Sequence, residues 1–270
     1  MNLGLAGQVV IVTGATANIG RGIALAFADE EAKLVLVGRD AEAGERVTTL
    51  ARTRGAREAV FVRADLLQAA SAQRILHAAE ALGPVAVLVN NVGGNVGAGC
   101  FVDSDPASWQ GDLDITLMTT LRMTHAVLPG MVRRRAGRIV NIGSTAGLVG
   151  DYMLPVYSAA KAAVHGFTRV LAKEVGQHDI TVNCVAPYGT MDEDPAAYSS
   201  GSRFHPQAGF MFKAFAGVKP EDAARRRRHG PLPRQLARPD DVAAAVIYLA
   251  SQRAGFITGQ IFSVDGGTLL

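Results

Sequence analysis

Short apolar runs alternate with longer amphipathic segments along the first part of the chain. Four runs rich in β-branched residues are typical of buried strands: 9–13, 33–38, 59–63 and 85–90. Between them, apolar residues recur with helical spacing at 23–31, 41–54 and 71–82. Strands that alternate with helices of this length predict parallel pairing through right-handed crossovers. The pattern therefore predicts an α/β sheet with helices on both faces.

The stretch 138–161 carries the strongest chemical signal. An apolar strand is followed by a Gly/Ser/Thr turn, a loop and a helix that opens around Tyr157. Tyr157 and Lys161 are four residues apart, so on a helix they share one face. A nearby ammonium favours a phenolate and lowers its pKa, which makes a tyrosine useful for acid–base catalysis. Ser144 follows the strand, where its hydroxyl could hold a substrate oxygen beside the phenol.

A glycine-rich turn at 14–22 follows the first strand. Gly14 and Gly20 would let the backbone turn tightly and approach a pyrophosphate, which would then lie over the amides of the next helix. The alternative is that these glycines only shape a strand-to-helix turn. The position of the turn, between the first strand and the first helix, favours a dinucleotide site.

Composition sets the frame for these motifs. With 270 residues, 49% of them hydrophobic and 19% charged, the chain fits one large domain over 1–270. Two cysteines are too few for a disulfide framework, and the histidines lack metal-ligand spacing, so no metal site is predicted. Without a secretory signal or a long apolar run, we expect a cytoplasmic protein with no membrane segment. The net charge of +3 fits ordinary surface charge better than nucleic-acid binding.

Together with Asp65, the stretch 90–93 and the ending ITGQIFSVDGG at 257–267, these motifs resemble the short-chain dehydrogenase/reductase family. The resemblance covers nearly the whole chain. It implies a single doubly wound, Rossmann-type domain with a mostly parallel seven-stranded sheet. It also implies a set of residues that bind the coenzyme: Thr13, Gly14, Thr16, Asn18, Ile19, Gly20, Asp65, Leu66, Asn90, Gly93, Tyr157, Lys161, Pro187 and Thr190.

The resemblance further implies that the chain interconverts a secondary alcohol and a ketone by direct hydride transfer with NAD(P)(H). In that family the tyrosine, here Tyr157, exchanges a proton with the substrate oxygen. Lys161 would lower the pKa of the phenol and bind the nicotinamide ribose, and Ser144 would orient the substrate. The family's catalytic asparagine falls on Thr116, which is expected to hold a water in the proton path. The family's glycine after Pro187 is a tyrosine, Tyr188.

The end of the second strand bears on which coenzyme is used. An NAD-preferring site would place a carboxylate there for the ribose 2′-hydroxyl. Gly38 occupies that position and Arg39, which suits a 2′-phosphate, follows it. The sequence therefore favours NADP(H) over NAD(H). Asp40 next to it leaves open that Arg39 is only a solvated turn residue.

The segment at about 188–235 is predicted to cover the substrate. Its apolar cluster indicates a mobile lid over a bulky, cyclic or aromatic substrate and consists of Phe204, Phe210, Met211, Phe212 and Phe215. The alternative is that these side chains pack on the body of the domain or on another subunit. The run Arg225 to Arg228 indicates a solvated or subunit-bridging face, with an anchor for an acidic substrate as the alternative.

Other functions remain open from the sequence. The substitutions at Asn18 and Thr116 are compatible with a catalytically weak binding or partner subunit. A reductase or dehydrogenase of the 3-hydroxyacyl-CoA type is a further alternative. The helix expected over 158–175 presents alanines beside Tyr157 and, by the resemblance, can pack against a symmetry mate. We therefore expect a homodimer or homotetramer.

Overall fold

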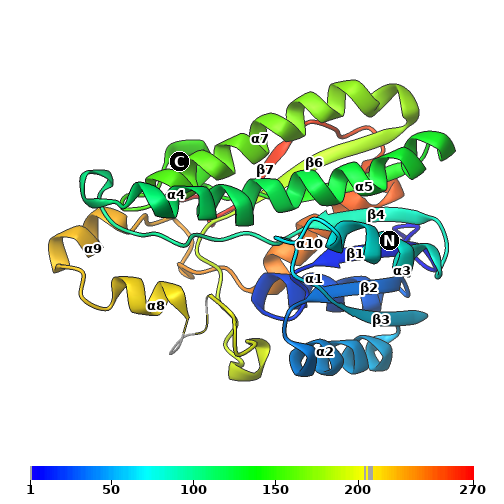
Figure 1. Cartoon of the computed structure of the whole chain (residues 1–270), viewed down its shortest axis with the longest axis horizontal. Coiled ribbons are helices and arrows are strands. Elements are labelled where there is room, and N and C mark those ends of the chain that lie inside the picture. The colour runs from blue at the N-terminus through cyan, green and yellow to red at the C-terminus, as the bar shows by residue number, and fades with distance from the viewer. Residues whose placement is uncertain (1, 204, 206–208) are drawn as a thin grey trace.

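Seven strands form one fully parallel sheet (Figure 1). The structure is a computed structural model that describes residues 2–203, 205 and 209–270. The strand order is β3-β2-β1-β4-β5-β6-β7. The strands are β1 (Val9–Thr13), β2 (Lys33–Gly38), β3 (Glu58–Arg63), β4 (Val85–Asn90), β5 (Gly137–Ile142), β6 (Ile180–Pro187) and β7 (Ile261–Val264). The predicted doubly wound fold is confirmed, and its switch point lies between β1 and β4.

Helices cover both faces of the sheet. The longer ones are α1 (Asn18–Asp29), α2 (Ala41–Arg54), α3 (Ser71–Glu80), α4 (Pro106–Leu113), α5 (Thr119–Arg134), α7 (Pro155–Val175) and α10 (Pro239–Ala250). Alternate residues of β1 enter two separate cores: Val10 and Val12 pack with α1, α2 and α10, whereas Val9 and Ile11 pack with α3, α5 and α7. Because both faces are buried, the strand is apolar from Val9 to Val12.

The first helix starts earlier than its apolar spacing predicts. It begins at Asn18, not at residue 23, because Gly20 and Gly22 lie inside the helix and not in the preceding turn. A side-chain Cβ at Gly22 would approach Pro239 Cβ to 2.6 Å. The glycine therefore permits the close packing of α1 on α10, which a pattern of apolar residues does not reveal.

Three short helices complete the chain, namely α6 (Ala146–Val149), α8 (Phe210–Phe215) and α9 (Pro220–Arg226). The last two belong to the segment between β6 and α10, and they lie at one end of the molecule (left in Figure 1). This segment leaves and rejoins the domain at neighbouring points, because Thr190 and Ala237 form a parallel bridge and Met191 N donates to Ala237 O at 3.0 Å. Within the described part of the chain, no helix has the length and apolar character needed to cross a membrane.

Candidate active site

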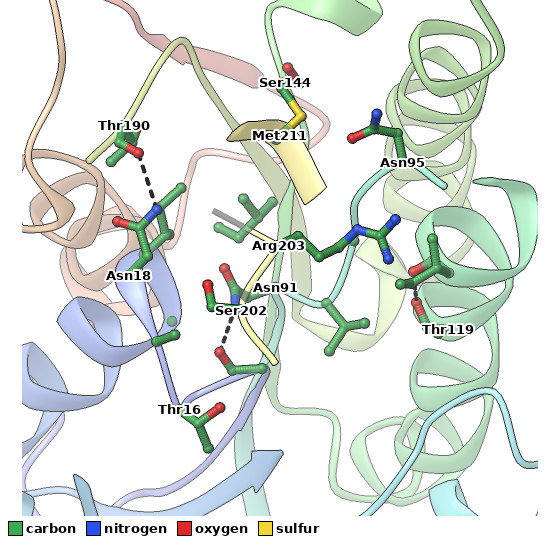
Figure 2. A pocket seen from close by; sticks show the side chains of 18 of the residues that line it. Thr16, Asn18, Asn91, Asn95, Thr119, Ser144, Thr190, Ser202, Arg203 and Met211 are labelled. Carbon is green, nitrogen blue, oxygen red and sulfur yellow. Dashed lines mark hydrogen bonds between the residues drawn. The ribbon is translucent and has the colours of Figure 1, made fainter. Parts of the chain in front are cut away.

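A cavity of about 400 Å³ opens at the carboxyl ends of the strands (Figure 2). The predicted site residues that line it are Gly14, Thr16, Asn18, Ile19, Gly20, Arg39, Asp65, Leu66, Gly93, Ser144, Tyr157, Lys161, Pro187 and Thr190. Three further predicted residues, Thr13, Asn90 and Thr116, do not line it. The cavity thus joins the glycine-rich turn to the Ser/Tyr/Lys group, although the two are more than a hundred residues apart in the sequence.

Lys161 is almost completely buried beneath the cavity. Its Nζ donates to the Ile142 carbonyl at 2.6 Å and lies 5.9 Å from the centroid of the Tyr157 ring. A side chain at Gly93 would bring its Cβ to 3.0 Å from this Nζ, so the glycine keeps the ammonium accessible from the cavity. Burial lowers the pKa of Lys161 to about 8, because a charged ammonium is poorly solvated there.

The pKa of Tyr157 is shifted in the direction opposite to the one predicted from the sequence. Burial raises the pKa of Tyr157 to about 12, while the Ser144 hydroxyl acts to lower it and the charge of Asp151 acts to raise it. The predicted lowering by Lys161 is therefore not found in the isolated chain. The reason is burial, which disfavours the charged phenolate and is the largest effect on this phenol. The phenol is accordingly protonated at neutral pH.

Thr116 braces the backbone instead of facing the cavity. It lies in a short π-helical turn, Asp114–Met118, and its hydroxyl donates to Gly94 O at 2.7 Å while accepting from Gly94 N at 3.1 Å. The hydroxyl has one proton and that proton is committed to Gly94, so Thr116 cannot donate a proton toward Lys161. What it does is fix the loop in which Gly93 approaches the ammonium.

Thr13 and Asn90 also act from behind the cavity. The Thr13 hydroxyl accepts hydrogen bonds from Asn91 N at 2.9 Å and Val92 N at 3.2 Å. Asn90 donates to Thr124 Oγ1 at 3.0 Å and to Asn141 Oδ1 at 2.9 Å, inside the protein. These two residues hold the end of β4 in place, and the neighbouring Asn91 is the one that lines the cavity.

The turn after β1 fits a dinucleotide pyrophosphate. Gly14 has φ +66, and a side chain at Gly20 would clash with the Gly14 carbonyl. Among the described residues, no side chain caps the first turn of α1, so its amides remain available to an anion. The backbone of Asn18 has a φ of 44°, and its side-chain Nδ2 donates to Thr190 O at 3.1 Å. Its buried Oδ1 has no hydrogen-bond partner in the described part of the chain, which leaves an acceptor for a ligand group.

The coenzyme-discriminating position after β2 is shaped by packing. A side chain at Gly38 would clash with the Thr16 methyl group, so no carboxylate fits there. Asp40 is engaged elsewhere: one carboxylate oxygen accepts from Ala43 N at 3.0 Å and the other from the Ser200 hydroxyl at 2.8 Å. These hydrogen bonds lower the pKa of Asp40. The exposed side chain of Arg39 makes no ion pair with any described residue.

Several lining residues were not predicted from the sequence. They come from loops and from the segment between β6 and α10 and include Asn95, Asp151 and Arg203, whereas Met211 and Arg226 belong to the predicted apolar cluster and arginine run. Figure 2 shows the guanidinium of Arg203 extending through the cavity toward the side occupied by Asn95 and Thr119. Burial lowers the pKa of Arg203 and the charge of Asp112 opposes this effect. These residues carry no periodic pattern that would signal a site.

The arginine run corrects the sequence-based interpretation. Helix α9 ends at Arg226, so the four arginines do not all lie on one helix. Arg228 is mostly shielded from solvent: it binds the Asp151 carboxylate, donates to Thr145 Oγ1 at 3.0 Å and lies over the Tyr188 ring at 4.7 Å. The apolar cluster is divided as well, because Met211 lines the cavity while Phe212 is 55% exposed. Phe204 lies outside the described residues.

Known proteins with related sequences and structures agree with this geometry. A sequence model of the family described as "short chain dehydrogenase" matches residues 8–197. The chain is 37% identical over 266 residues to 2-(S)-hydroxypropyl-CoM dehydrogenase 3 of Xanthobacter autotrophicus, covering 97% of both chains. It is 38% identical over 237 residues to the inactive 2-(S)-hydroxypropyl-CoM dehydrogenase 2 of the same organism, covering 87% of this chain and 94% of that protein.

A solved structure extends the likeness to three dimensions. It is a 7α-hydroxysteroid dehydrogenase complexed with NADH and 7-oxo glycochenodeoxycholic acid. The two chains superpose with a TM-score of 0.83 at 29% identity, over 98% of this chain and 96% of that one. The likeness therefore includes the whole sheet and the segment that follows β6.

Proposed function

The chain belongs to the short-chain dehydrogenase/reductase family of NAD(P)-dependent enzymes acting on CH–OH groups, and from this we propose that it interconverts a secondary alcohol and a ketone through Tyr157. The observation that carries the proposal is the cavity that joins the glycine-rich turn to Ser144, Tyr157 and Lys161. Bound NAD(P)(H) would supply or accept the hydride. The protein's own residues would bind the coenzyme, orient the substrate and protonate the substrate oxygen.

In ketone reduction, Tyr157 is the proton donor to the substrate oxygen. The raised pKa of Tyr157, about 12, keeps the phenol protonated at neutral pH, which suits this role. Ser144 lies beside it, and its oxygen accepts a hydrogen bond from Ala146 N at 3.1 Å, which places the hydroxyl where it would meet the substrate oxygen together with the phenol. Lys161 would return a proton to the phenol or stabilise the phenolate, and Thr116 would act by holding the Gly93–Gly94 backbone.

We further propose that the segment 188–235 covers a bulky, cyclic or aromatic substrate. Met211 and Tyr188 contribute apolar surface to the same cavity as Tyr157. The structure complexed with 7-oxo glycochenodeoxycholic acid is consistent with a bulky, cyclic substrate. An acyl-CoA type substrate is a second candidate, since relatives of this chain include reductases of 3-oxoacyl carrier-protein substrates.

A screen tests the function directly. The purified chain would be titrated with NADPH and NADH by fluorescence and assayed with cyclic, aromatic and 3-oxoacyl ketones. Coenzyme binding with turnover of at least one ketone class is expected. Coenzyme binding without any turnover would contradict the proposal and would support a role as a binding or partner subunit. One relative, the 2-(S)-hydroxypropyl-CoM dehydrogenase 2 named above, is described as inactive.

The coenzyme preference is proposed to be NADP(H). Replacing Arg39 by Ala should weaken NADPH binding by about 10- to 100-fold, because a charge-assisted contact to the 2′-phosphate is lost. NADH binding should change little, since NADH lacks that phosphate. The matched control is Arg46→Ala, which removes an equal charge from α2, where Arg46 pairs with Glu42 at 2.6 Å. Equal weakening of both coenzymes by Arg39→Ala, or tighter NADH binding by the unmodified chain, would contradict the preference.

We also propose that the chain is a homodimer or homotetramer. Along α7, one exposed strip consists of small or apolar residues: Ala159, Ala162, Gly166 and Val170. A side chain at Gly166 would meet no atom within 4 Å, so the strip is open for another helix. The predicted alanine face is narrower than expected, because Ala160 is buried in the core.

A cytoplasmic location remains a prediction from the sequence.

A further inference from the structure

Arg226 stands apart within the arginine run. Arg225 pairs with Asp222 at 3.7 Å, Arg227 is exposed, and Arg228 is bound to Asp151. Arg226 lines the cavity, yet it makes no ion pair with a carboxylate among the described residues. A cation that faces a ligand cavity without a partner is a candidate for binding an anionic group of the ligand.

The guanidinium of Arg226 lies over an aromatic ring. Its Cζ lies 3.3 Å from the centroid of the Phe215 ring, which is itself half-buried. Stacking occupies one face of the guanidinium and leaves the N–H groups at its edge free for hydrogen bonds. Burial lowers the pKa of Arg226, which shows that the group is partly removed from water. A charge-assisted hydrogen bond is stronger in such a place than on an open surface.

Arg226 lines the same cavity as the reactive phenol. Asp151 acts electrostatically on both groups, raising the pKa of Tyr157 and opposing the lowering at Arg226. The Asp151 carboxylate is already bound by Arg228, which also donates to Thr145 Oγ1. Arg226 therefore lines the cavity that holds Tyr157 with no carboxylate bound to it among the described residues.

We propose that Arg226 binds a carboxylate carried by the substrate, so that the preferred substrates are ketones or alcohols with an acidic group. The inference rests on the proposed function for the identity of the reacting group. Asp151 and Arg228 act as positioning residues that fix the loop next to Tyr157, while Phe215 orients the guanidinium. Helix α9 lies at one end of the molecule, in the segment between β6 and α10 (Figure 1), and Arg226 at the end of this helix lines the cavity.

Equilibrium binding gives a test that does not depend on turnover. The chain, saturated with NADP⁺ or NAD⁺, would be titrated by calorimetry with 4-acetylbenzoate, 4-oxopentanoate and 6-oxoheptanoate, and with the methyl ester of each. The oxidised coenzyme prevents reaction of the ketone during the measurement. At least one acid should bind about tenfold more tightly than its ester.

The variants separate recognition from support of the fold. Arg226→Gln should weaken binding of that acid by about 10- to 100-fold and leave its ester unchanged. Arg226→Lys should be intermediate, because the charge is kept and the planar fork is lost. Arg227→Gln, the matched exposed control, should change neither ligand. An equal loss for acid and ester in Arg226→Gln would mean that the residue only supports Phe215, and it would overturn the inference, as would a lack of acid preference in every pair.

Turnover with NADPH and NADH, measured on the same ligands, keeps the two proposals apart. Tight binding of an acid without turnover would uphold the role of Arg226 and contradict the proposed reaction. Turnover of acids and esters that bind equally tightly would support the proposed reaction and contradict the role of Arg226.

Discussion

Replacing Tyr157 by Phe is expected to lower kcat about 10²- to 10⁴-fold, the range by which a positioned acid–base group accelerates a reaction. The change removes a single hydroxyl from a residue that lies four positions before Lys161 on α7 and keeps the ring in place. The phenol lines the cavity together with Ser144 and is protonated at neutral pH, so its loss removes the proposed proton donor. Steady-state kinetics on any ketone identified in the screen would measure the effect.

The coenzyme affinity of Tyr157→Phe serves as the internal check. It should fall far less than kcat, because the glycine-rich turn and the α1 amides are untouched and only one of the expected coenzyme contacts is lost. Tyr248→Phe is the matched control, since this tyrosine is 41% exposed on α10 and far along the chain from the site. Near-normal turnover by Tyr157→Phe would show that the proton comes from elsewhere and would remove the basis of the proposed mechanism.

Acid is expected to destabilise the protein through His165. This residue follows Lys161 by one helical turn on α7 and is only 2% exposed. Burial, with a smaller effect from the charge of Lys161, lowers the pKa of His165 from 6.5 to about 4. At a pH between 6.5 and about 4, His165 is protonated in the unfolded chain and neutral in the folded chain. The free energy of unfolding therefore falls as the pH falls through this range. At about 1.4 kcal/mol per pKa unit, the loss from pH 7 to pH 4 is on the order of 3 kcal/mol.

Other groups also titrate in this range, so the effect of His165 is measured by difference. Urea unfolding at pH 7.5 and pH 4.5 would be compared for the unmodified chain and for His165→Met, which cannot gain a proton. The variant should lose less stability between the two pH values, whatever its stability at pH 7.5. His125→Gln, at an exposed position on α5, should follow the unmodified chain. Parallel losses in all three proteins would exclude a buried neutral imidazole at position 165.

The sheet could be predicted from the sequence because its strands are buried on both faces. The ranges predicted for β1, β2 and β4 match the structure, since runs of β-branched residues begin and end with the strand. The start of α1 could not be predicted, because Gly20 and Gly22 resemble a loop and are selected by contacts with Gly14 and Pro239. Contacts of this kind depend on the tertiary structure and leave no periodic trace.

The site was predictable where its parts are close in sequence. Tyr157 and Lys161 lie on one helix, and Ser144 follows an adjoining strand, so local geometry brings them together. Asp151 and Arg228 are 77 positions apart and meet only through the segment after β6. Thr116 was predicted to face the proton path and instead binds Gly94, because the π-helical turn redirects its hydroxyl. Side-chain direction in such a turn does not follow the 3.6-residue period.

The bridge between Thr190 and Ala237 makes the intervening stretch an exchangeable cassette. The bridge holds the two ends of this stretch next to each other. The entropy cost of closing the loop increases only slowly with its length, so a shorter or longer stretch from a relative could replace it. The sheet and the glycine-rich turn lie outside those junctions and would keep their geometry. Engineering of substrate range in this enzyme can therefore begin with grafts between positions 190 and 237, leaving the hydride-transfer scaffold as it is.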